Sequence, residues 1–124
     1  MHALIVDDST TMRMILKAHL KKLGFEVTEA VNGRDALDRL KAMVTADLVM
    51  VDWNMPEMDG LDFVRAVRTE AAYAALPMMM VTTNTDRAHV EQALEAGANE
   101  YIMKPFTADM IREKLDLLGL LAAQ

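Results

Sequence analysis

Three apolar runs of four residues each place the strongest constraint on how this chain folds. They occupy residues 3–6, 48–51 and 78–81, and a polar residue follows each of them at once. Continuous apolar runs of this length are typical of strands that are covered on both faces of a parallel sheet. Residues 25–29 alternate instead, as expected of an edge strand, and residues 100–103 give a fifth and weaker strand pattern.

Apolar residues at helical spacing fill the interval after each predicted strand. In the first interval Thr10 or Thr11 can cap the helix, and Gly24 can end it in the left-handed conformation. Thr107 is the expected N-cap of the last helix, with Pro105 just outside it. The expected stripes are Met12, Ile15, Leu16, Leu20 and Leu23; Ala36, Leu37, Leu40 and Val44; Leu61, Val64 and Val67; Val90, Ala93 and Leu94; and Ile111, Leu115 and Leu118.

Five alternations of strand and helix predict an α/β fold, with a parallel sheet, right-handed crossovers and helices on both faces. The 124 residues, 52% of them apolar, suit a single domain over residues 1–124.

The lack of cysteine excludes disulfides and thiolate chemistry, and a net charge of −6 argues against binding to nucleic acid or anionic membranes. No run approaches the roughly 20 apolar residues that span a bilayer. We expect a cytoplasmic monomer, and most of the 12 methionines in the core.

Polar side chains with complementary chemistry follow four of the predicted strands. Asp7 and Asp8 follow the first strand, Asp52 the third, Thr82 the fourth and Lys104 the fifth. Open α/β sheets bind ligands beyond the carboxyl ends of their strands, where the strand order reverses. Any one of the aspartates alone is better explained as a helix cap or an acidic surface loop residue. Lys104 with Pro105 could be a turn before a helix, and Thr82 could be a hydroxyl that bonds to the backbone at the end of a strand. The joint placement of these residues predicts a functional site.

The residue types at this edge favour a divalent cation and phosphoryl transfer. Three clustered carboxylates repel one another unless a cation lies among them. The ligand atoms are all oxygen, and the three histidines, His2, His19 and His89, are scattered, so Mg²⁺ is favoured over zinc. A metal site beside a lysine suits phosphoryl transfer, in which one aspartate acts as the nucleophile.

At these residues the chain resembles the response-regulator receiver domains of bacterial two-component signalling, and most closely their single-domain chemotaxis type, CheY. The motifs are VDDS at residues 6–9, DWNMPEMDG at 52–60, MVTT at 80–83 and KPF at 104–106. The acidic pair alone is a weak signal, whereas the long second motif and its spacing to the other two are specific. The resemblance covers essentially the whole chain. It implies a flavodoxin-like, doubly wound (βα)5 fold with strand order 2-1-3-4-5.

The resemblance also implies roles for the residues at the strand ends. Asp52 is expected to accept a phosphoryl group from the phosphohistidine of a histidine kinase or from a small phosphodonor. Asp8, Asp52 and the backbone carbonyl of Asn54 are expected to bind Mg²⁺ directly, and Asp7 through water. Lys104 is expected to pair with the phosphoryl group, and its peptide bond to Pro105 to be cis, a rare state even for proline.

Thr82 and Tyr101 are the residues that the resemblance identifies as the switch. Phosphorylation adds negative charge and acceptor oxygens beside Thr82, which draw its hydroxyl inward. The movement vacates volume that Tyr101, outward in the resting state, then fills. This change couples the site to the surface formed by the fourth helix, the fifth strand and the fifth helix, where Lys114 fits a motor-binding surface.

The resemblance implies a switch that catalyses only its own phosphorylation and dephosphorylation, and not an enzyme with a separate substrate. Its partners are expected to be a histidine kinase and a downstream protein, either the flagellar motor switch or a phosphotransfer protein. Asn84 stands where the chemotaxis type often has an acidic residue, so Asn84 and Asn54 are expected to tune the lifetime of the phosphoryl group. Asp86 and Arg87 make the start of the fourth helix less basic than in that type.

Two other classes fit the sequence poorly. A haloacid-dehalogenase phosphatase needs a second aspartate two residues after the nucleophile, where Asn54 stands, and a cap insertion. A flavodoxin-like cofactor binder needs a glycine-rich phosphate loop, whereas residues 7–11 open with two carboxylates. Two further possibilities stay open: a phosphorelay intermediate that passes its phosphoryl group to a histidine phosphotransfer protein, and a receiver fragment of a larger regulator.

Overall fold

The computed structural model describes residues 1–83 and 87–121. Within these ranges, five strands alternate with five α-helices, and a short 3-10 helix, η1 (Ala71–Tyr73), precedes the fourth strand. The strands are β1 (His2–Val6), β2 (Glu26–Ala30), β3 (Leu48–Asp52), β4 (Met78–Thr82) and β5 (Glu100–Met103). The helices are α1 (Thr10–Lys22), α2 (Gly33–Ala42), α3 (Gly60–Arg68), α4 (Arg87–Ala96) and α5 (Ala108–Leu117).

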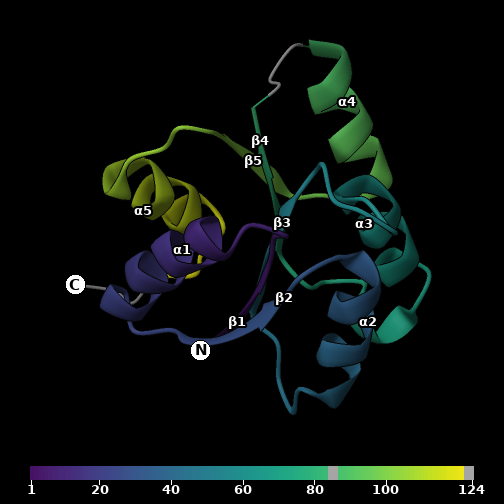
Figure 1. Ribbon diagram of the computed structural model, residues 1–124, viewed down its shortest axis with the longest axis horizontal. Helices are drawn as coiled ribbons and strands as arrows, with labels where there is room; N and C mark the ends of the chain where they lie inside the picture. Colours follow the sequence, from purple (N-terminus) through teal and green to yellow (C-terminus); the bar gives the residue numbers. More distant parts are fainter. Residues whose placement is uncertain (84–86, 122–124) are drawn as a thin grey trace.

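All strand pairs are parallel, and the sheet order is β2-β1-β3-β4-β5. Helices α1 and α5 cover one face of the sheet, and α2, α3 and α4 cover the other (Figure 1). The predicted doubly wound, flavodoxin-like fold is thus confirmed. Because the strand order reverses between β1 and β3, the carboxyl ends of these central strands form the crevice where such folds bind ligands.

The continuous apolar runs are explained by two cores, one on each face of the sheet. In β3, Val49 and Val51 pack into the core beneath α2, α3 and α4, whereas Leu48 and Met50 pack beneath α1 and α5. Successive side chains of a strand point to opposite faces, so a strand covered on both sides must be apolar throughout. Nine of the twelve methionines lie in or against these cores, as predicted.

Side-chain caps begin the helices close to the predicted positions. Ser9 is the N-cap of α1, and its hydroxyl oxygen accepts a hydrogen bond from the backbone N–H of Met12 (3.2 Å). The predicted cap at Thr10 or Thr11 is therefore wrong. Thr107 caps α5, as predicted. Gly24 follows α1 at a φ of 90°, which confirms its predicted role as the stop.

Some residues of the predicted apolar stripes are exposed. Val44 is 99% exposed because α2 ends at Ala42, two residues earlier. Ile15 and Leu94 are 41% and 48% exposed, at the margins of the helix faces that pack on the sheet. Helical spacing identified the buried face of each helix correctly, but it predicted a wider buried face than the structure has. In the described part of the chain, no helix has both the length and the apolar character that crossing a membrane requires.

Arg68 at the end of α3 joins segments that lie far apart in the sequence. Its guanidinium donates to the carbonyl oxygens of Gly97 (3.0 Å) and Tyr73 (2.6 Å) and to the side-chain oxygen of Asn99 (2.8 Å). Partial burial lowers the pKa of Arg68, yet the group remains a cation at neutral pH. These bonds hold the loops before β4 and β5 against α3.

We therefore expect Arg68→Met to lower the free energy of unfolding by about 2 kcal/mol, because it removes three hydrogen bonds from a charged donor, those to Gly97, Tyr73 and Asn99. Urea unfolding followed by circular dichroism measures the change. Arg65→Met is the matched control, since Arg65 is 56% exposed and its pair with Asp62 is 3.6 Å long. Its effect is expected to stay within about 0.5 kcal/mol. Equal losses in the two variants would contradict the prediction.

Candidate functional site

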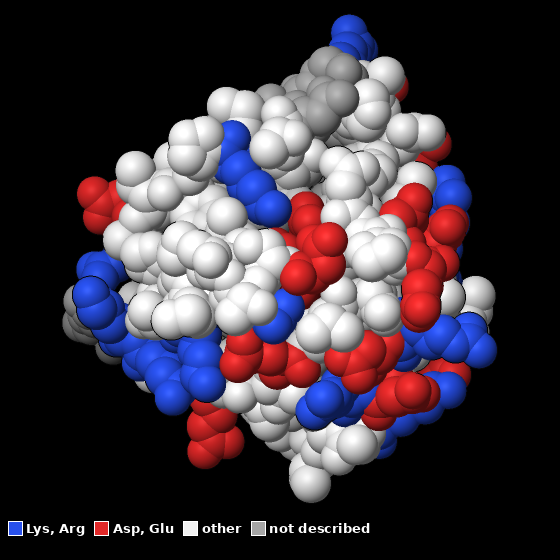
Figure 2. All heavy atoms as spheres, viewed as in Figure 1, with Lys and Arg blue, Asp and Glu red and all other residues white. Residues whose placement is uncertain are grey.

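The carboxyl ends of four strands bring the predicted residues together at one edge of the sheet. Asp7 and Asp8 follow β1, Asp52 and Thr82 are the last residues of β3 and β4, and Lys104 follows β5. Acidic side chains gather near the centre of the molecular face in Figure 2, between the two groups of helices. The structure therefore confirms the predicted convergence.

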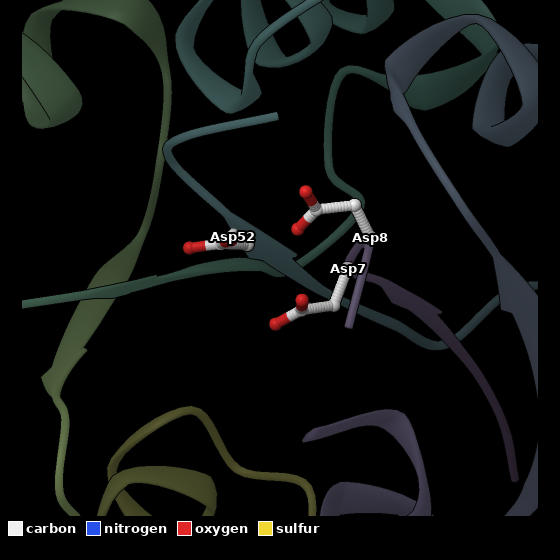
Figure 3. A group of neighbouring side chains, drawn as sticks. All are labelled: Asp7, Asp8 and Asp52. Carbon is white, nitrogen blue, oxygen red and sulfur yellow. The ribbon is translucent and has the colours of Figure 1, made fainter. Parts of the chain in front are cut away.

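The three carboxylates form a compact group. One oxygen from each of Asp7, Asp8 and Asp52 lies within 4.8 Å of the others. In Figure 3 the three side chains extend to the same side of the strand ends. Asp7 is 1% exposed and Asp52 is 7% exposed, while Asp8 is open to solvent. A cluster of oxygen donors with one open side fits a hard divalent cation, so these residues could hold a metal.

Lys104 lies against the buried part of this cluster. Its ammonium is 3.3 Å from Asp7 Oδ2 and 3.3 Å from Asp52 Oδ1. The backbone helps to place it there, because the Lys104 N–H donates to the carbonyl oxygen of Thr82 (2.8 Å). The peptide bond between Lys104 and Pro105 is cis, as predicted. One ammonium cannot balance three carboxylates, so the site keeps an excess of negative charge.

The site disfavours ionisation of Asp52. Its pKa is raised above the ordinary value of 3.8, chiefly because burial removes water from the carboxylate. Lys104 acts in the opposite direction, and the charges of Asp7 and Asp8 raise the pKa further. A cation bound among the three carboxylates would relieve both the repulsion and the desolvation.

Asp7 is held in place by Arg13, which was not predicted, and by Ser9, which was named only as part of the VDDS motif. The Ser9 N–H donates to Asp7 Oδ1 (2.8 Å), and the Arg13 guanidinium donates to the Asp7 carbonyl oxygen (2.7 Å). Arg13 is itself held by Glu29 of β2 at 3.3 Å. The sequence could have indicated the contact between Arg13 and Asp7, because Arg13 lies about one turn into the helix that follows Asp7 and Asp8.

The loop after Asp52 folds back tightly onto the end of β3. The Gly60 N–H donates to the carbonyl oxygen of Trp53 (2.9 Å), and Asp59 caps α3 by accepting from the backbone. The Trp53 ring meets His89 of α4 edge to face, with ring centroids 5.3 Å apart. The close approach at Gly60 and the contact with His89 were not predicted. Asn54 is exposed in this loop.

The two residues of the predicted switch lie on the same face of the sheet. In the register of β4 and β5, Met80 pairs with Tyr101 and Thr82 pairs with Met103. Thr82 and Tyr101 are therefore diagonal neighbours, within reach of an aromatic side chain. Thr82 is 4% exposed, and Tyr101 is partly buried against the core beneath α2, α3 and α4.

Two positions singled out from the sequence, Asn84 and Asp86, lie outside the described residues. Arg87 is the first residue of α4.

The chain is similar to known proteins over nearly its whole length. Residues 3–116 match the family model of the response regulator receiver domain. The chemotaxis protein CheY1 of Helicobacter pylori is 46% identical over 119 residues, which cover 95% of this chain and 96% of that protein. A CheY homolog of Campylobacter jejuni is 49% identical over 121 residues, with 96% and 93% covered.

The fold has close counterparts among solved structures. The structure of the chemotaxis response regulator CheY4 of Vibrio cholerae matches with a TM-score of 0.89 at 33% identity, over 94% of this chain and 97% of that one. The family match, the relatives and the structural neighbour each cover most of the chain. The chain therefore belongs to the response regulator receiver domain family, and it is a receiver of the CheY type.

Proposed function

We propose that this chain is a phosphorylation-activated switch of the chemotaxis type, which accepts a phosphoryl group on Asp52 from a histidine kinase. The observation that carries the proposal is the contact of Asp52 with Lys104 (3.3 Å) beside two further carboxylates, in a chain of the receiver family. As a family member it is a signalling switch and not an enzyme that acts on a metabolite. The named relatives favour a chemotaxis role over a phosphorelay intermediate.

Access and hydrogen bonding favour Asp52 over Asp7 as the phosphoryl acceptor. Both oxygens of Asp7 already accept hydrogen bonds, from the Ser9 N–H and the Lys104 ammonium, and its side chain is 1% exposed. The Asp52 side chain is 10% exposed. A carboxylate oxygen of Asp52 would attack the phosphorus of the donor, and the imidazole of the phosphohistidine would leave with the electrons of its bond to phosphorus.

The charges around Asp52 suit a phosphoryl group. Asp8, Asp52 and the backbone carbonyl of Asn54 would hold Mg²⁺, with Asp7 acting through water. When bound, Mg²⁺ supplies positive charge that neutralises the oxygens of the transferred group. Lys104 offers a second, fixed positive charge, and the Thr82 hydroxyl would donate a hydrogen bond to a phosphoryl oxygen.

The output would arise from coupled movements of Thr82 and Tyr101. Movement of Thr82 toward the phosphoryl group would open space for Tyr101 on the same face of the sheet, and the surface of α4, β5 and α5 would change. The downstream partner would be a protein such as the flagellar motor switch. Because the relatives match over 93% or more of their own length, we propose a single receiver domain over residues 1–124. We also propose that the protein is cytoplasmic and monomeric.

Incubation with acetyl phosphate tests the proposed chemistry. With Mg²⁺ present, intact-mass spectrometry is expected to show one phosphoryl adduct, and EDTA in place of Mg²⁺ is expected to prevent it. A chain that stays unmodified at saturating acetyl phosphate and Mg²⁺, or one that is modified equally in EDTA, would overturn this part of the proposal.

Lys104→Met is expected to slow formation of the adduct about 100-fold, because it removes a fixed positive charge from the site where phosphoryl charge accumulates. The methionine keeps most of the side-chain length. A time course of intact mass in Mg²⁺ and acetyl phosphate measures the rate. Lys17→Met, which removes a partly exposed lysine paired with Glu29 at 3.4 Å, is the control and should react like the wild type. Equal rates for both variants would exclude this role for Lys104.

A further inference from the structure

Lys114 of α5 reaches around the open edge of the sheet to the ring of Tyr101. Helix α5 packs on the α1 side of the sheet through Ile111 and Leu115, whereas Tyr101 packs against the core on the opposite side. The ammonium of Lys114 nevertheless lies 4.6 Å from the centroid of the Tyr101 ring. This contact is possible because β5 is the edge strand of the sheet formed by the described residues.

Glu100 fixes both partners of this contact. Its Oε1 atom accepts a hydrogen bond from the Lys114 ammonium (2.8 Å) and another from the backbone N–H of Tyr101 (3.0 Å). The side chains of Lys114 and Glu100 are 27% and 19% exposed, so water only partly screens the pair. The Tyr101 residue is therefore held at its backbone by Glu100 and at its ring by Lys114.

A pair at the other edge of the sheet provides a comparison. Lys17 of α1 reaches Glu29 of β2 at 3.4 Å, with side chains that are 38% and 34% exposed. The pair at Tyr101 is shorter and more buried. At a partly exposed site, a cation over an aromatic ring shifts the equilibrium between the ring position that makes this contact and one that does not by a factor of about 2 to 5.

We propose that Lys114, anchored by Glu100, is a latch that holds Tyr101 in its resting position at the edge of β5. Lys114 is a positioning residue, since it acts through the Tyr101 ring. The inference rests on the proposed function, in which Tyr101 is the switch aromatic that moves toward Thr82. The latch favours the resting form, so it sets how much of the unphosphorylated protein is in the active form.

Fluorine NMR of protein labelled with 3-fluorotyrosine tests the latch in the unphosphorylated protein, with the acetyl phosphate-treated wild type as the reference for the inward ring. The chain has two tyrosines, and the spectrum of a Tyr101→Phe variant assigns the Tyr101 resonance. In unphosphorylated, metal-free protein, Lys114→Met is expected to move this resonance toward its position in the acetyl phosphate-treated wild type. The population with an inward ring should rise about 2- to 5-fold.

Two further variants separate the latch from a general effect of lost charge. Lys114→Arg keeps a cation over the ring and should restore the wild-type resonance. Lys17→Met removes the lysine at the opposite edge of the sheet and should leave the resonance unchanged. Glu100→Gln removes the charge that anchors Lys114 and should shift the resonance in the same direction as Lys114→Met.

The possible failures are distinguishable. A Tyr101 resonance that is the same in Lys114→Met as in the wild type, or that moves equally in Lys17→Met, would overturn the latch. An adduct that forms on the wild type without moving the Tyr101 resonance would remove Tyr101 from the switch, and the inference with it. If no adduct forms, the proposed function fails, and the difference between Lys114→Met and Lys114→Arg still shows whether Lys114 holds the ring.

Discussion

Replacing Asp52 with asparagine is expected to abolish phosphorylation of the chain and, at the same time, to make the metal-free protein more stable. Phosphorylation fails because an amide oxygen is a far weaker nucleophile than a carboxylate. Stability rises because the ionised Asp52 is poorly solvated and lies beside two other carboxylates, which Lys104 only partly offsets. The neutral amide removes that repulsion and retains a hydrogen-bond acceptor for Lys104.

The gain in stability has a defined pH dependence. The pKa of folded Asp52 is raised above 3.8, so the folded chain binds this proton more tightly than the unfolded chain. Protonated Asp52 therefore contributes to the stability of the wild type at acidic pH. This contribution is lost as the pH rises from 3.8 through the higher pKa of folded Asp52. Asp52→Asn has no such proton, so its advantage is smallest at acidic pH and largest at neutral pH.

Urea unfolding in EDTA at several pH values, together with intact mass after acetyl phosphate treatment, measures both effects. Asp38→Asn, at an exposed position on α2, is the control, and it should match the wild type in adduct formation and stability. An Asp52→Asn variant that is less stable than the wild type at neutral pH in EDTA would contradict the electrostatic description of the site. A stability advantage of Asp52→Asn over the wild type that shrinks as pH rises would contradict it equally.

Replacing Gly60 with alanine is expected to lower the free energy of unfolding by about 3 kcal/mol and to disturb the position of Asp52. A Cβ atom at Gly60 would clash with the carbonyl oxygen of Asp52 and lie 3.0 Å from the Asp52 carbonyl carbon and the Cα of Trp53. All three atoms belong to the backbone, which cannot move aside as a flexible side chain does. The end of β3 would have to shift, and the nucleophile with it.

Gly24→Ala is the informative control for Gly60→Ala. A Cβ at Gly24 meets no atom within 4 Å, but the backbone there has a φ of 90°. That variant should lose only about 1 to 2 kcal/mol from conformational strain, and should still form the phosphoryl adduct at the wild-type rate. Urea unfolding and the adduct time course measure both quantities. If Gly60→Ala lost no more stability than Gly24→Ala and reacted as fast, the close packing at Gly60 would have no functional role.

Most of the fold was predictable because the apolar pattern of this chain is simple. A strand such as β3 is buried on both faces and must be apolar throughout, so it stands out from the amphipathic helices beside it. The site was predictable for a related reason. The carboxyl ends of parallel strands lie at the same edge, so a residue that ends a strand, such as Asp52 or Thr82, is placed by the strand itself.

The contacts that depend on how helices sit against the edges of the sheet were not predictable. The bond from Arg13 to Glu29 and that from Lys114 to Glu100 join residues whose distance is set by tertiary packing and not by local spacing. The same limit explains Val44, which has apolar chemistry at a helical position but lies beyond the end of its helix. The tight approach at Gly60 required the path of the loop after β3, which no local pattern specifies.

The most direct test of the central claim is to identify the modified carboxylate. Borohydride reduces an acyl phosphate to an alcohol, so it converts a phosphorylated aspartate to homoserine, which peptide mass mapping can locate. After treatment with Mg²⁺ and acetyl phosphate, we expect homoserine in place of Asp52, with Asp7 and Asp8 unchanged. Homoserine in place of Asp7 or Asp8, or spread over all three positions, would contradict the assignment of Asp52 as the phosphoryl acceptor.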